Sequence, residues 1–295
     1  MARKLYELGI DLHTHSTASD GTESPINLVK MAVSSGIGVL ALTDHDTVSG
    51  VQEALKASAN LPITFVPGLE ISANSTFGHI HVLGLGLNKI PHKMQTLLEN
   101  IQNGRRERNP KIIRKLNTLG YKISMSDVTE MACGDIIGRP HIAKALVKNG
   151  YFAVQEEAFA KLLKHNAPAY VQRWRPSVKE AVDTILACSA VPIIAHPGLL
   201  DVSSNTSLRS IIRNLKDDGI MGLEVHYTMH SASQHKELDE ISENFDMIPT
   251  GGSDFHGDNN HHAKLGHGTA GLPIGHYYAD KLMDYLNIQW KDKTP

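Results

Sequence analysis

Two histidines and an aspartate crowd the beginning of the chain. The stretch GIDLHTHSTASDG places His13, His15 and Asp20 within eight residues, directly after an apolar run. Residues i and i+2 of an extended strand share a face, so His13 and His15 can converge on one point. A buried strand has little use for two imidazoles at its end unless they bind something. These residue types indicate a metal site with nitrogen and carboxylate ligands.

Comparable polar motifs lie at the ends of most predicted strands. They are TDHD at 43–46, GLEIS at 68–72, AHPG at 195–198 and GSDFH at 252–256, with HIH at 79–81 early in its own strand. A nearly buried carboxylate such as Glu70, or an imidazole such as His196, needs a partner. One such motif is weak support for a metal site, but five or six at strand ends predict a metal centre.

The candidate ligands are histidines and carboxylates, because the two cysteines form no metal motif. Asp20 precedes Gly21 and has an alternative interpretation as an ordinary turn residue. His79 and His81 share one face of a strand, and we favour His81 as the ligand. The candidate ligands at this point are His13, His15, Asp20, Glu70, His81, His196, Asp254 and His256, together with the polar residues of TDHD at 43–46.

A regular succession of strands and helices must position these motifs. Apolar runs predict strands at 5–12, 37–46, 63–72, 79–87, 190–198, 219–227 and 245–256. Helical patterns lie between them, for example at 24–36, 48–60 and 177–189. Near-continuous apolar strands separated by helices indicate a parallel sheet covered on both faces. In a barrel of parallel strands the chemistry lies at the carboxyl ends of the strands, where these polar motifs fall.

The alternation stops between residues 92 and 168. Helical patterns at 92–121 and 139–165 fill this stretch, and Pro110 is expected to kink or end the first. The first pattern carries Arg105, Arg106 and Arg108, which either contact an RNA backbone or form an ordinary solvated face. We predict three segments: a first barrel part at 1–91, a helical insertion at 92–168 and a second barrel part at 169–295.

A candidate phosphate site lies at the start of a helix in the insertion. Pro140 suits the first turn of this helix, and Gly150 suits its end. Arg139 and His141 then lie at a helix N-terminus, where backbone N–H groups and the helix dipole favour phosphate. Arg139 offers a planar, bidentate fork for phosphate oxygens. A surface salt bridge is the alternative role for Arg139.

Composition excludes several classes of protein. The 295 residues are 41% hydrophobic and 20% charged, which is typical of a globular chain. A net charge of −2 argues against a strongly basic polyanion-binding chain, so any nucleic-acid contact must be local. Without a signal-peptide pattern or a bilayer-length apolar run, we expect a cytoplasmic protein with no membrane contact and no obligate protein partner. Cys133 and Cys188 are expected to be reduced and structural.

Together, the motifs DLHTHSTASDG, ALTDHDT, GLEIS, HVLGLG, AHPG and GSDFH resemble the PHP (polymerase and histidinol phosphatase) superfamily of metal-dependent phosphoesterases. They match in residue type, order and spacing from about Ile10 to His256, apart from the insertion. The insertion, with GRPHIAKALVKNG, resembles the bacterial branch of 5′-3′ exoribonucleases and nucleoside 3′,5′-bisphosphate phosphatases. The resemblance implies an α/β fold: a distorted seven-stranded (β/α) PHP barrel with a helical insertion domain that caps the substrate.

The resemblance also implies three divalent transition metals. One would be held by His13, His15, Glu70 and Asp254, a second by Glu70, His81 and His196, and the third by Asp20, His45 and His256. These ligands suit Mn²⁺, with Fe²⁺ or Zn²⁺ as alternatives. A metal-bound hydroxide would attack phosphorus without a protein nucleophile. Asp44 is expected to accept a hydrogen bond from a ligand imidazole, and His226 is a candidate proton donor to the leaving oxygen.

These features predict a metal-dependent phosphoric ester hydrolase. Its substrates would be the 3′-phosphate of nucleoside 3′,5′-bisphosphates or the 5′ nucleotides of short 5′-monophosphorylated RNA, removed in the 5′→3′ direction. Arg139 and His141 would hold one phosphate while the next is hydrolysed. Histidinol-phosphate phosphatase is the alternative within the enzyme class, and the GRPH insertion argues against it. A metal-binding protein without turnover is a third alternative, and the complete ligand set argues against that one.

Overall fold

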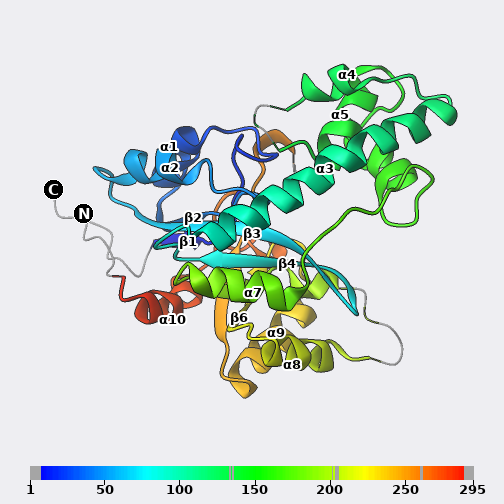
Figure 1. The fold of residues 1–295 in the computed structure, drawn as a ribbon. Coiled ribbons are helices and arrows are strands. Elements are labelled where there is room, and N and C mark those ends of the chain that lie inside the picture. The colour runs from blue at the N-terminus through cyan, green and yellow to red at the C-terminus, as the bar shows by residue number, and fades with distance from the viewer. Residues whose placement is uncertain are drawn as a thin grey trace.

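The computed structural model contains one seven-stranded sheet surrounded by helices (Figure 1). It describes residues 8–132, 134, 136–200, 202, 206–259 and 262–288. The strands are β1 (Gly9–Asp11), β2 (Ile37–Leu42), β3 (Thr64–Ser75), β4 (Gly78–Leu85), β5 (Val191–Ile194), β6 (Gly222–Tyr227) and β7 (Ile248–Gly252). They lie side by side in the order β1 to β7. The α/β fold and the seven strands confirm the sequence prediction.

The sheet is mixed, which corrects the expectation of a wholly parallel sheet. β4 runs antiparallel to β3 and β5, whereas the other neighbouring strands pair in parallel. Ser75 pairs directly with Gly78, so only residues 76–77 connect β3 to β4. A turn this short joins antiparallel strands, because a parallel crossover needs a dozen or more residues. As a result, the beginning of β4 lies at the same edge of the sheet as the ends of β3 and β5.

Helices cover the outside of the sheet, and several of them begin at a serine cap. They are α1 (Pro25–Ser34), α2 (Val51–Ser58), α7 (Val178–Ala187), α8 (Leu208–Asp217), α9 (Ala232–Asn244) and α10 (Tyr277–Leu286), with the short helices η3 (Pro197–Leu199), η4 (Gly257–Asn259) and η5 (Thr269–Gly271). Serine hydroxyls accept hydrogen bonds from the first turns of α1, α7, α8 and α9. Such caps satisfy donors that a helix leaves unpaired, and they fix where each helix begins.

Both faces of the sheet are buried because successive strand residues are apolar. β2 and β5 are buried at every position. Leu83 and Ile193 point into an inner cluster that includes Ile10. Their neighbours Val82 and Ile194 point outward, into a cluster beneath α3, α7 and α8. This double burial explains the near-continuous apolar runs of the sequence.

The first and last strands meet beyond the ends of β1 and β7. Leu12 N–H donates to the carbonyl of Gly251 at 3.0 Å, and Asp254 N–H donates to the carbonyl of His13 at 2.9 Å. Hydrogen bonds between the first and last strands are what a barrel requires. They also bring the loops after β1 and β7 together.

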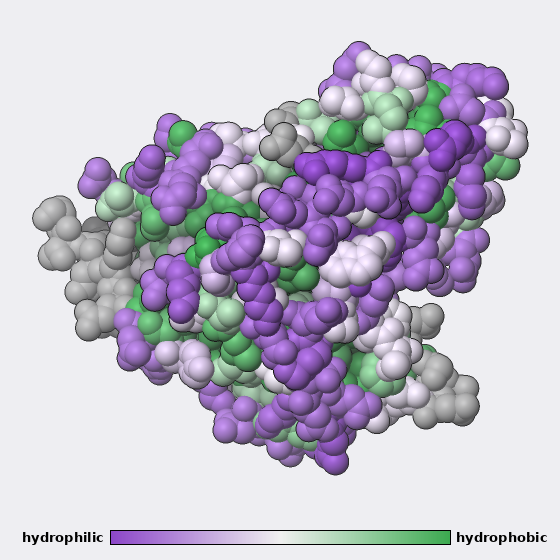
Figure 2. All heavy atoms as spheres, viewed as in Figure 1, coloured by the Kyte–Doolittle hydropathy of each residue, from purple (hydrophilic) through white to green (hydrophobic). Residues whose placement is uncertain are grey.

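The described residues of 92–168 form a helical segment: the start of α3 packs on the sheet, and the remaining helices extend away from it (Figure 1). Its helices are α3 (His92–Thr118), α4 (Met125–Thr129), α5 (Arg139–Lys148), α6 (Gln155–Ala158) and η2 (Phe159–Leu163). They enclose an apolar cluster of their own, with Ile112 and Leu146 at its centre. Pro110 lies inside α3, so the expectation that Pro110 would end this helix is wrong. Hydrophilic side chains cover the outward side of α3 (Figure 2). The division into three segments stays a prediction.

Two expectations from composition bear on the described residues. Cys188 is a free, buried thiol, whereas Cys133 lies outside the described residues. No helix of the described residues is both long and apolar enough to cross a membrane.

Candidate metal centre

The predicted ligands come together at one edge of the sheet. The loops after β1, β2, β5 and β7 contribute His13, His15, Asp20, His45, His196, Asp254 and His256. Glu70 lies within β3, where its parallel pairing with β2 has ended, and it faces His45 across an isolated bridge. His81 lies near the start of β4, and the reversal of that strand brings it to the same edge. His79 points elsewhere: its ring nitrogens lie 2.9 Å from Asn74 Oδ1 and from Tyr170 Oη.

The fully buried carboxylate of Glu70 lies at the centre of the cluster. Imidazole nitrogens surround its oxygens at 2.7–3.4 Å, from His81 and His196 at Oε1 and from His13, His15 and His45 at Oε2. A carboxylate with imidazoles on both oxygens is in position to bridge two cations.

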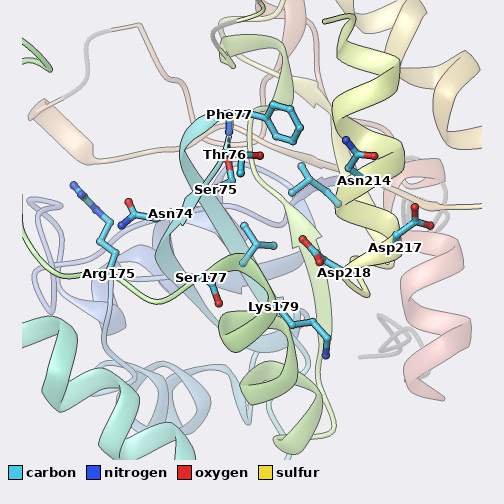
Figure 3. Close-up of a pocket in the computed structure, with 12 residues that line it drawn as sticks. Asn74, Ser75, Thr76, Phe77, Arg175, Ser177, Lys179, Asn214, Asp217 and Asp218 are labelled. Atoms are coloured by element: carbon cyan, nitrogen blue, oxygen red, sulfur yellow. Dashed lines mark hydrogen bonds between the residues drawn. The ribbon is translucent and has the colours of Figure 1, made fainter.

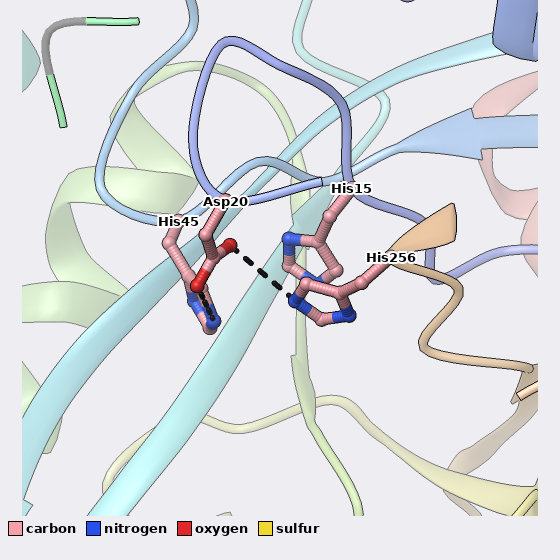
Figure 4. Close-up of side chains that lie close together, drawn as sticks. All are labelled: His15, Asp20, His45 and His256. Carbon is pink, nitrogen blue, oxygen red and sulfur yellow. Dashed lines mark ion pairs between the residues drawn. The ribbon is translucent and has the colours of Figure 1, made fainter. Parts of the chain in front are cut away.

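A second group, drawn in Figure 4, lies beside Glu70, which His45 contacts. His15, Asp20, His45 and His256 place ligand atoms within 4.8 Å of one another. Asp20 Oδ1 lies 3.3 Å from His256 Nε2, and Asp20 Oδ2 lies 4.0 Å from His45 Nε2. Asp20 is buried here among imidazoles, which argues against its alternative role as an ordinary turn residue.

Asp254 completes a third group with two histidines. Its Oδ1 lies 3.4 Å from His13 Nε2 and 3.0 Å from His15 Nε2. His15 therefore belongs to two groups, and His45 lies within reach of both Asp20 and Glu70. The assignment of each ligand to one particular metal stays a prediction.

Several buried ligand atoms lie in close ion-pair contacts but form no hydrogen bond of good geometry. They are His13 Nε2, both ring nitrogens of His15, Asp20 Oδ1, His45 Nδ1, Glu70 Oε2 and His81 Nδ1. A buried polar group without a partner costs about 1–3 kcal/mol, so folded proteins rarely leave such groups together. Unpaired imidazole and carboxylate lone pairs that face one space form the donor set of divalent transition metals. The residues therefore fit the metals that the motifs imply.

The carboxylates make the centre strongly negative. Burial lowers the pKa of His45, but Glu70 and Asp20 outweigh burial and raise that pKa to about 9. Burial likewise lowers the pKa of His256, and Asp254 and Asp20 raise it to about 10. Burial and the neighbouring His256 and His45 instead lower the pKa of His15 to about 3. The protons drawn onto His45 and His256 are ones that divalent cations, attracted by the same carboxylates, would displace.

Glu224, which the sequence analysis did not single out, supports two of the ligands. This buried β6 residue places Oε1 3.0 Å from His13 Nδ1 and accepts the His196 N–H on Oε2 at 2.7 Å. A carboxylate at Nδ1 leaves the Nε2 lone pair of His13 for a metal. His196 needs this support because its φ of 35° is left-handed, which costs a non-glycine residue about 1–3 kcal/mol.

Asp44 does not contact a ligand imidazole, contrary to the sequence expectation. Its carboxylate accepts the N–H and hydroxyl of Ser16, each at 2.7 Å, and the hydroxyl of Ser19 at 2.6 Å. Asp44 and His45 are adjacent and point in different directions, so only His45 faces the ligands. Asp44 instead fixes the loop that carries Asp20.

His226 lies outside the centre, so the prediction that it donates a proton to the leaving oxygen is wrong. Its Nδ1 accepts the Thr269 N–H at 2.9 Å, and its ring packs on Tyr278 with centroids 5.3 Å apart. The pairing register of β6 shifts between Glu224 and His226, which changes the face on which the following residues lie. Tyr227 faces the centre instead and donates to Asp254 Oδ2 at 3.0 Å.

A cleft of ≈ 180 Å³ separates the ligands from the helical segment. Asp20, His45 and His81 line it on the sheet side. The arginines that line it are Arg105 and Arg108 of α3, Arg139 of α5, and Arg173 and Arg175 of the segment before α7. Arg106 instead faces solvent, where it donates to Asn103 Oδ1 at 2.8 Å. Arg106 is therefore the one α3 arginine that fits the interpretation of an ordinary solvated face, whereas Arg105 and Arg108 line the cleft.

These arginines have few carboxylates to neutralise them. Asp46 accepts bonds from Arg105 and, at 3.1 Å, from Arg173, and these two cations outweigh burial and hold the pKa of Asp46 below its ordinary value. Arg139 donates to the carbonyl of Leu163 at 2.8 Å, and within the described part of the chain no carboxylate forms an ion pair with it. Burial, and then the other arginines, lower the pKa of Arg139 to about 10 and that of Arg173 to about 9. Such a cleft favours anions.

His141 lies at the N-terminus of α5, as predicted, but it does not line the cleft. Its buried ring accepts the Gly138 N–H on Nδ1 at 3.0 Å and so caps its own helix. Burial lowers the pKa of His141 to about 4, so the ring is neutral at pH 7. A direct contact between His141 and phosphate stays a prediction.

Known proteins resemble this chain along most of its length. A model of the PHP domain family matches residues 11–186. A 5′-3′ exoribonuclease of Haemophilus influenzae is 35% identical over 246 residues, which cover 83% of this chain and 89% of that protein. A 3′,5′-nucleoside bisphosphate phosphatase of Chromobacterium violaceum is 31% identical over 265 residues, which cover 90% and 92%.

Solved structures share the fold. A Bifidobacterium adolescentis protein described as a metal-dependent phosphoesterase superposes with a TM-score of 0.82 at 28% identity, covering 94% of this chain and 96% of that one. An amidohydrolase of Chromobacterium violaceum gives a TM-score of 0.79 at 29% identity, covering 91% and 90%. The family model spans more than half of the chain and includes six of the clustered ligands, namely His13, His15, Asp20, His45, Glu70 and His81. The chain therefore belongs to the PHP domain family, and it is a metal-dependent phosphoesterase.

Proposed function

We propose that this phosphoesterase removes the 3′-phosphate of nucleoside 3′,5′-bisphosphates and the 5′ nucleotides of short RNA that carries a 5′-monophosphate. The observation that carries the proposal is the cleft, in which arginines from α3, α5 and the segment before α7 lie opposite the metal ligands. Both substrates carry two phosphates one nucleoside apart. The arginines would hold the 5′-phosphate while the 3′ phosphorus lies over the ligand cluster.

The nine predicted ligands would hold three divalent cations, for which we favour Mn²⁺. Cations bound there supply Lewis-acid activation of a water and of the phosphoryl oxygens. The chain itself orients the ligands: Glu224 fixes His13, Tyr227 holds Asp254, and Asp44 ties down the Asp20 loop. No described side chain is assigned as a nucleophile.

The shape of the cleft favours the end of a chain. At ≈ 180 Å³ the cleft is smaller than the ~300–1,000 Å³ of typical small-molecule sites, so it takes a terminal group and not a continuous strand. Arg139 has its guanidinium 5.1 Å from the Phe159 ring centroid, which holds its planar fork in a fixed orientation. Terminal recognition of this kind supports stepwise removal from the 5′ end. The similarity to an exoribonuclease and a bisphosphate phosphatase supports both substrates.

Histidinol-phosphate phosphatase is the alternative enzyme, and it would use the same metals. Its substrate has one phosphate and a positively charged amine, which the arginine-rich cleft disfavours. A metal-binding protein without turnover is the non-enzymatic alternative. It is disfavoured because the cleft leaves room for an anion directly beside the ligands.

A substrate panel tests the proposal. Phosphate or mononucleotide release is measured with Mn²⁺ on adenosine 3′,5′-bisphosphate, on 5′-phosphate and 5′-hydroxyl forms of one short RNA, and on histidinol phosphate. We expect turnover of the bisphosphate and of the 5′-phosphorylated RNA, and poor turnover of the other two. Equal rates on 5′-phosphate and 5′-hydroxyl RNA would show that the arginine cleft does not recognise the 5′-phosphate. Turnover of histidinol phosphate alone would establish the alternative.

A further inference from the structure

A second hollow lies beside the cleft, at the tip of the β3–β4 hairpin. It has a volume of ≈ 680 Å³ and is bounded by the hairpin, the start of α7 and the end of α8 (Figure 3). Asn74, Phe77, Ser177 and Asn214 are among its lining residues. Neither the metal ligands nor the contacts described above account for this hollow.

The hollow continues the cleft. Arg175 lines both spaces, and Ser72 of the cleft lies two residues before Asn74 of the hollow on β3. Alternate strand residues share a face, so Glu70, Ser72 and Asn74 follow one another on the side that carries the metal ligands. Two residues of strand span about 7 Å. The hollow therefore begins at Asn74 and Arg175, one short step beyond the cleft, and continues around the hairpin to Phe77, which packs on the outer cluster.

The lining of the hollow suits a nucleotide. Phe77 is half-buried against the core, and its ring lies beside Asn214 in Figure 3, so it offers an aromatic face fixed in position. Arg175 brings positive charge to the side nearer the cleft, whereas Lys179 lies on the other side of the hollow, near Asp217 and Asp218. A base stacked on an aromatic ring with its phosphate on basic residues is the usual arrangement for single-stranded nucleic acid.

We propose that this hollow binds the nucleotide on the 3′ side of the bond that is cleaved. The RNA would run from the arginine cleft, across the ligand cluster and past Arg175, to stack its second base on Phe77. This inference rests on the proposed function and extends it from the terminal nucleotide to its neighbour. It predicts that residues of the hollow act on RNA and not on a single nucleotide.

The test compares two substrates on each variant. Adenosine 3′,5′-bisphosphate fills the cleft alone, whereas 5′-phosphorylated triadenylate also reaches the hollow. Phe77→Ala is expected to lower kcat/KM on triadenylate by about 5- to 150-fold, the effect of losing one base stack, and to leave the bisphosphate reaction unchanged. Tyr277→Ala is the matched control, because Tyr277 is a half-exposed aromatic residue on α10 that does not line the hollow.

A second variant guards against misfolding, because the Phe77 ring also packs on the core. Lys179 is exposed and pairs with Asp183 on the surface of α7, so Lys179→Glu should fold normally. It is expected to weaken triadenylate binding most at low salt, where surface charges act furthest. Lys236→Glu is its control, because Lys236 is an exposed lysine on α9 that also lies near a carboxylate four residues further on, and it is expected to leave triadenylate binding unchanged.

The outcomes separate this inference from the proposed function. If the wild type cleaves neither substrate, the proposed function itself has failed. If Phe77→Ala lowers kcat/KM equally on the bisphosphate and on triadenylate, the hollow holds the terminal base, and the inference is wrong. If Phe77→Ala and Lys179→Glu leave triadenylate cleavage unchanged while the wild type cleaves it, the RNA follows another path.

Discussion

Replacing Glu224 by glutamine is expected to weaken metal binding at His13 while leaving the fold in place. The glutamate accepts at both oxygens, from His13 Nδ1 at 3.0 Å and from the His196 N–H at 2.7 Å. Glutamine has the same size but only one accepting oxygen, the other position being an NH₂ donor. The His196 N–H can only donate, so the amide oxygen must face it. The amide NH₂ then faces His13 Nδ1.

This arrangement changes the tautomer of His13. Its Nδ1 must now accept, so the ring proton moves to Nε2, the nitrogen that lies 3.4 Å from both Glu70 and Asp254. A protonated nitrogen cannot bind a metal. Loss of a partner behind a ligand histidine typically costs about 10- to 100-fold in metal affinity. A buried hydrogen bond to a charged group contributes about 1.5–3 kcal/mol, which corresponds to a similar factor.

Calorimetric titration of metal-free protein with Mn²⁺ measures this effect directly. Glu180→Gln is the matched control, because Glu180 accepts hydrogen bonds from Ser177 at the exposed start of α7, away from the ligands. Its metal affinity should equal that of the wild type, and thermal melting should show that both variants fold. Wild-type Mn²⁺ affinity in Glu224→Gln would refute the reasoning that Glu224 sets the tautomer of His13.

Three further outcomes are expected. Removing divalent cations with a chelator should abolish phosphate release, and added Mn²⁺ should restore it. Arg139→Ala should lower kcat/KM on 5′-phosphorylated RNA about tenfold or more, because the variant loses a hydrogen bond to the 5′-phosphate. An aryl phosphate has no such second phosphate and should lose less, so equal losses in kcat/KM on the two substrates would contradict this role. Gly252→Ala should reduce the free energy of unfolding, measured in urea, by about 1–3 kcal/mol, because the added Cβ would meet His13 Cβ at 2.2 Å. Gly275→Ala is the control, because a Cβ added at Gly275 meets open space.

The placement of the ligands could be predicted because it depends on local pattern. An apolar strand that ends in His-x-His or Asp-x-His directs those side chains toward one edge, whatever the rest of the chain does. The direction of β4 could not be inferred from apolar runs, because strands buried on both faces have the same composition whether parallel or antiparallel. The short link at residues 76–77 was the available signal, since a parallel crossover cannot be that short.

The supporting carboxylates were harder to find than the ligands. Glu224 lies in GLEVHY, which repeats the Gly-Leu-Glu of GLEIS around Glu70, so the rule that a buried carboxylate needs a partner applied equally to it. Asp44 and Asp46 flank His45 in one motif, and only the three-dimensional contacts show that one holds a loop and the other holds arginines. Residues of this kind act through partners far away in sequence. Their roles therefore depend on tertiary contacts that spacing does not encode.

The two sides of the cleft carry opposite charge, and this arrangement limits what can bind. Buried carboxylates form one side, and each has lost hydration that only cations or protons can replace. Arginines form the other side, with Asp46 as a neutralising carboxylate for two of them. A cation alone would leave the arginines without a counter-ion, and an anion alone would be repelled by the carboxylates. Divalent metals together with a phosphate ester satisfy both sides at once, which is why the same geometry that binds this pair also places the phosphorus beside the metals.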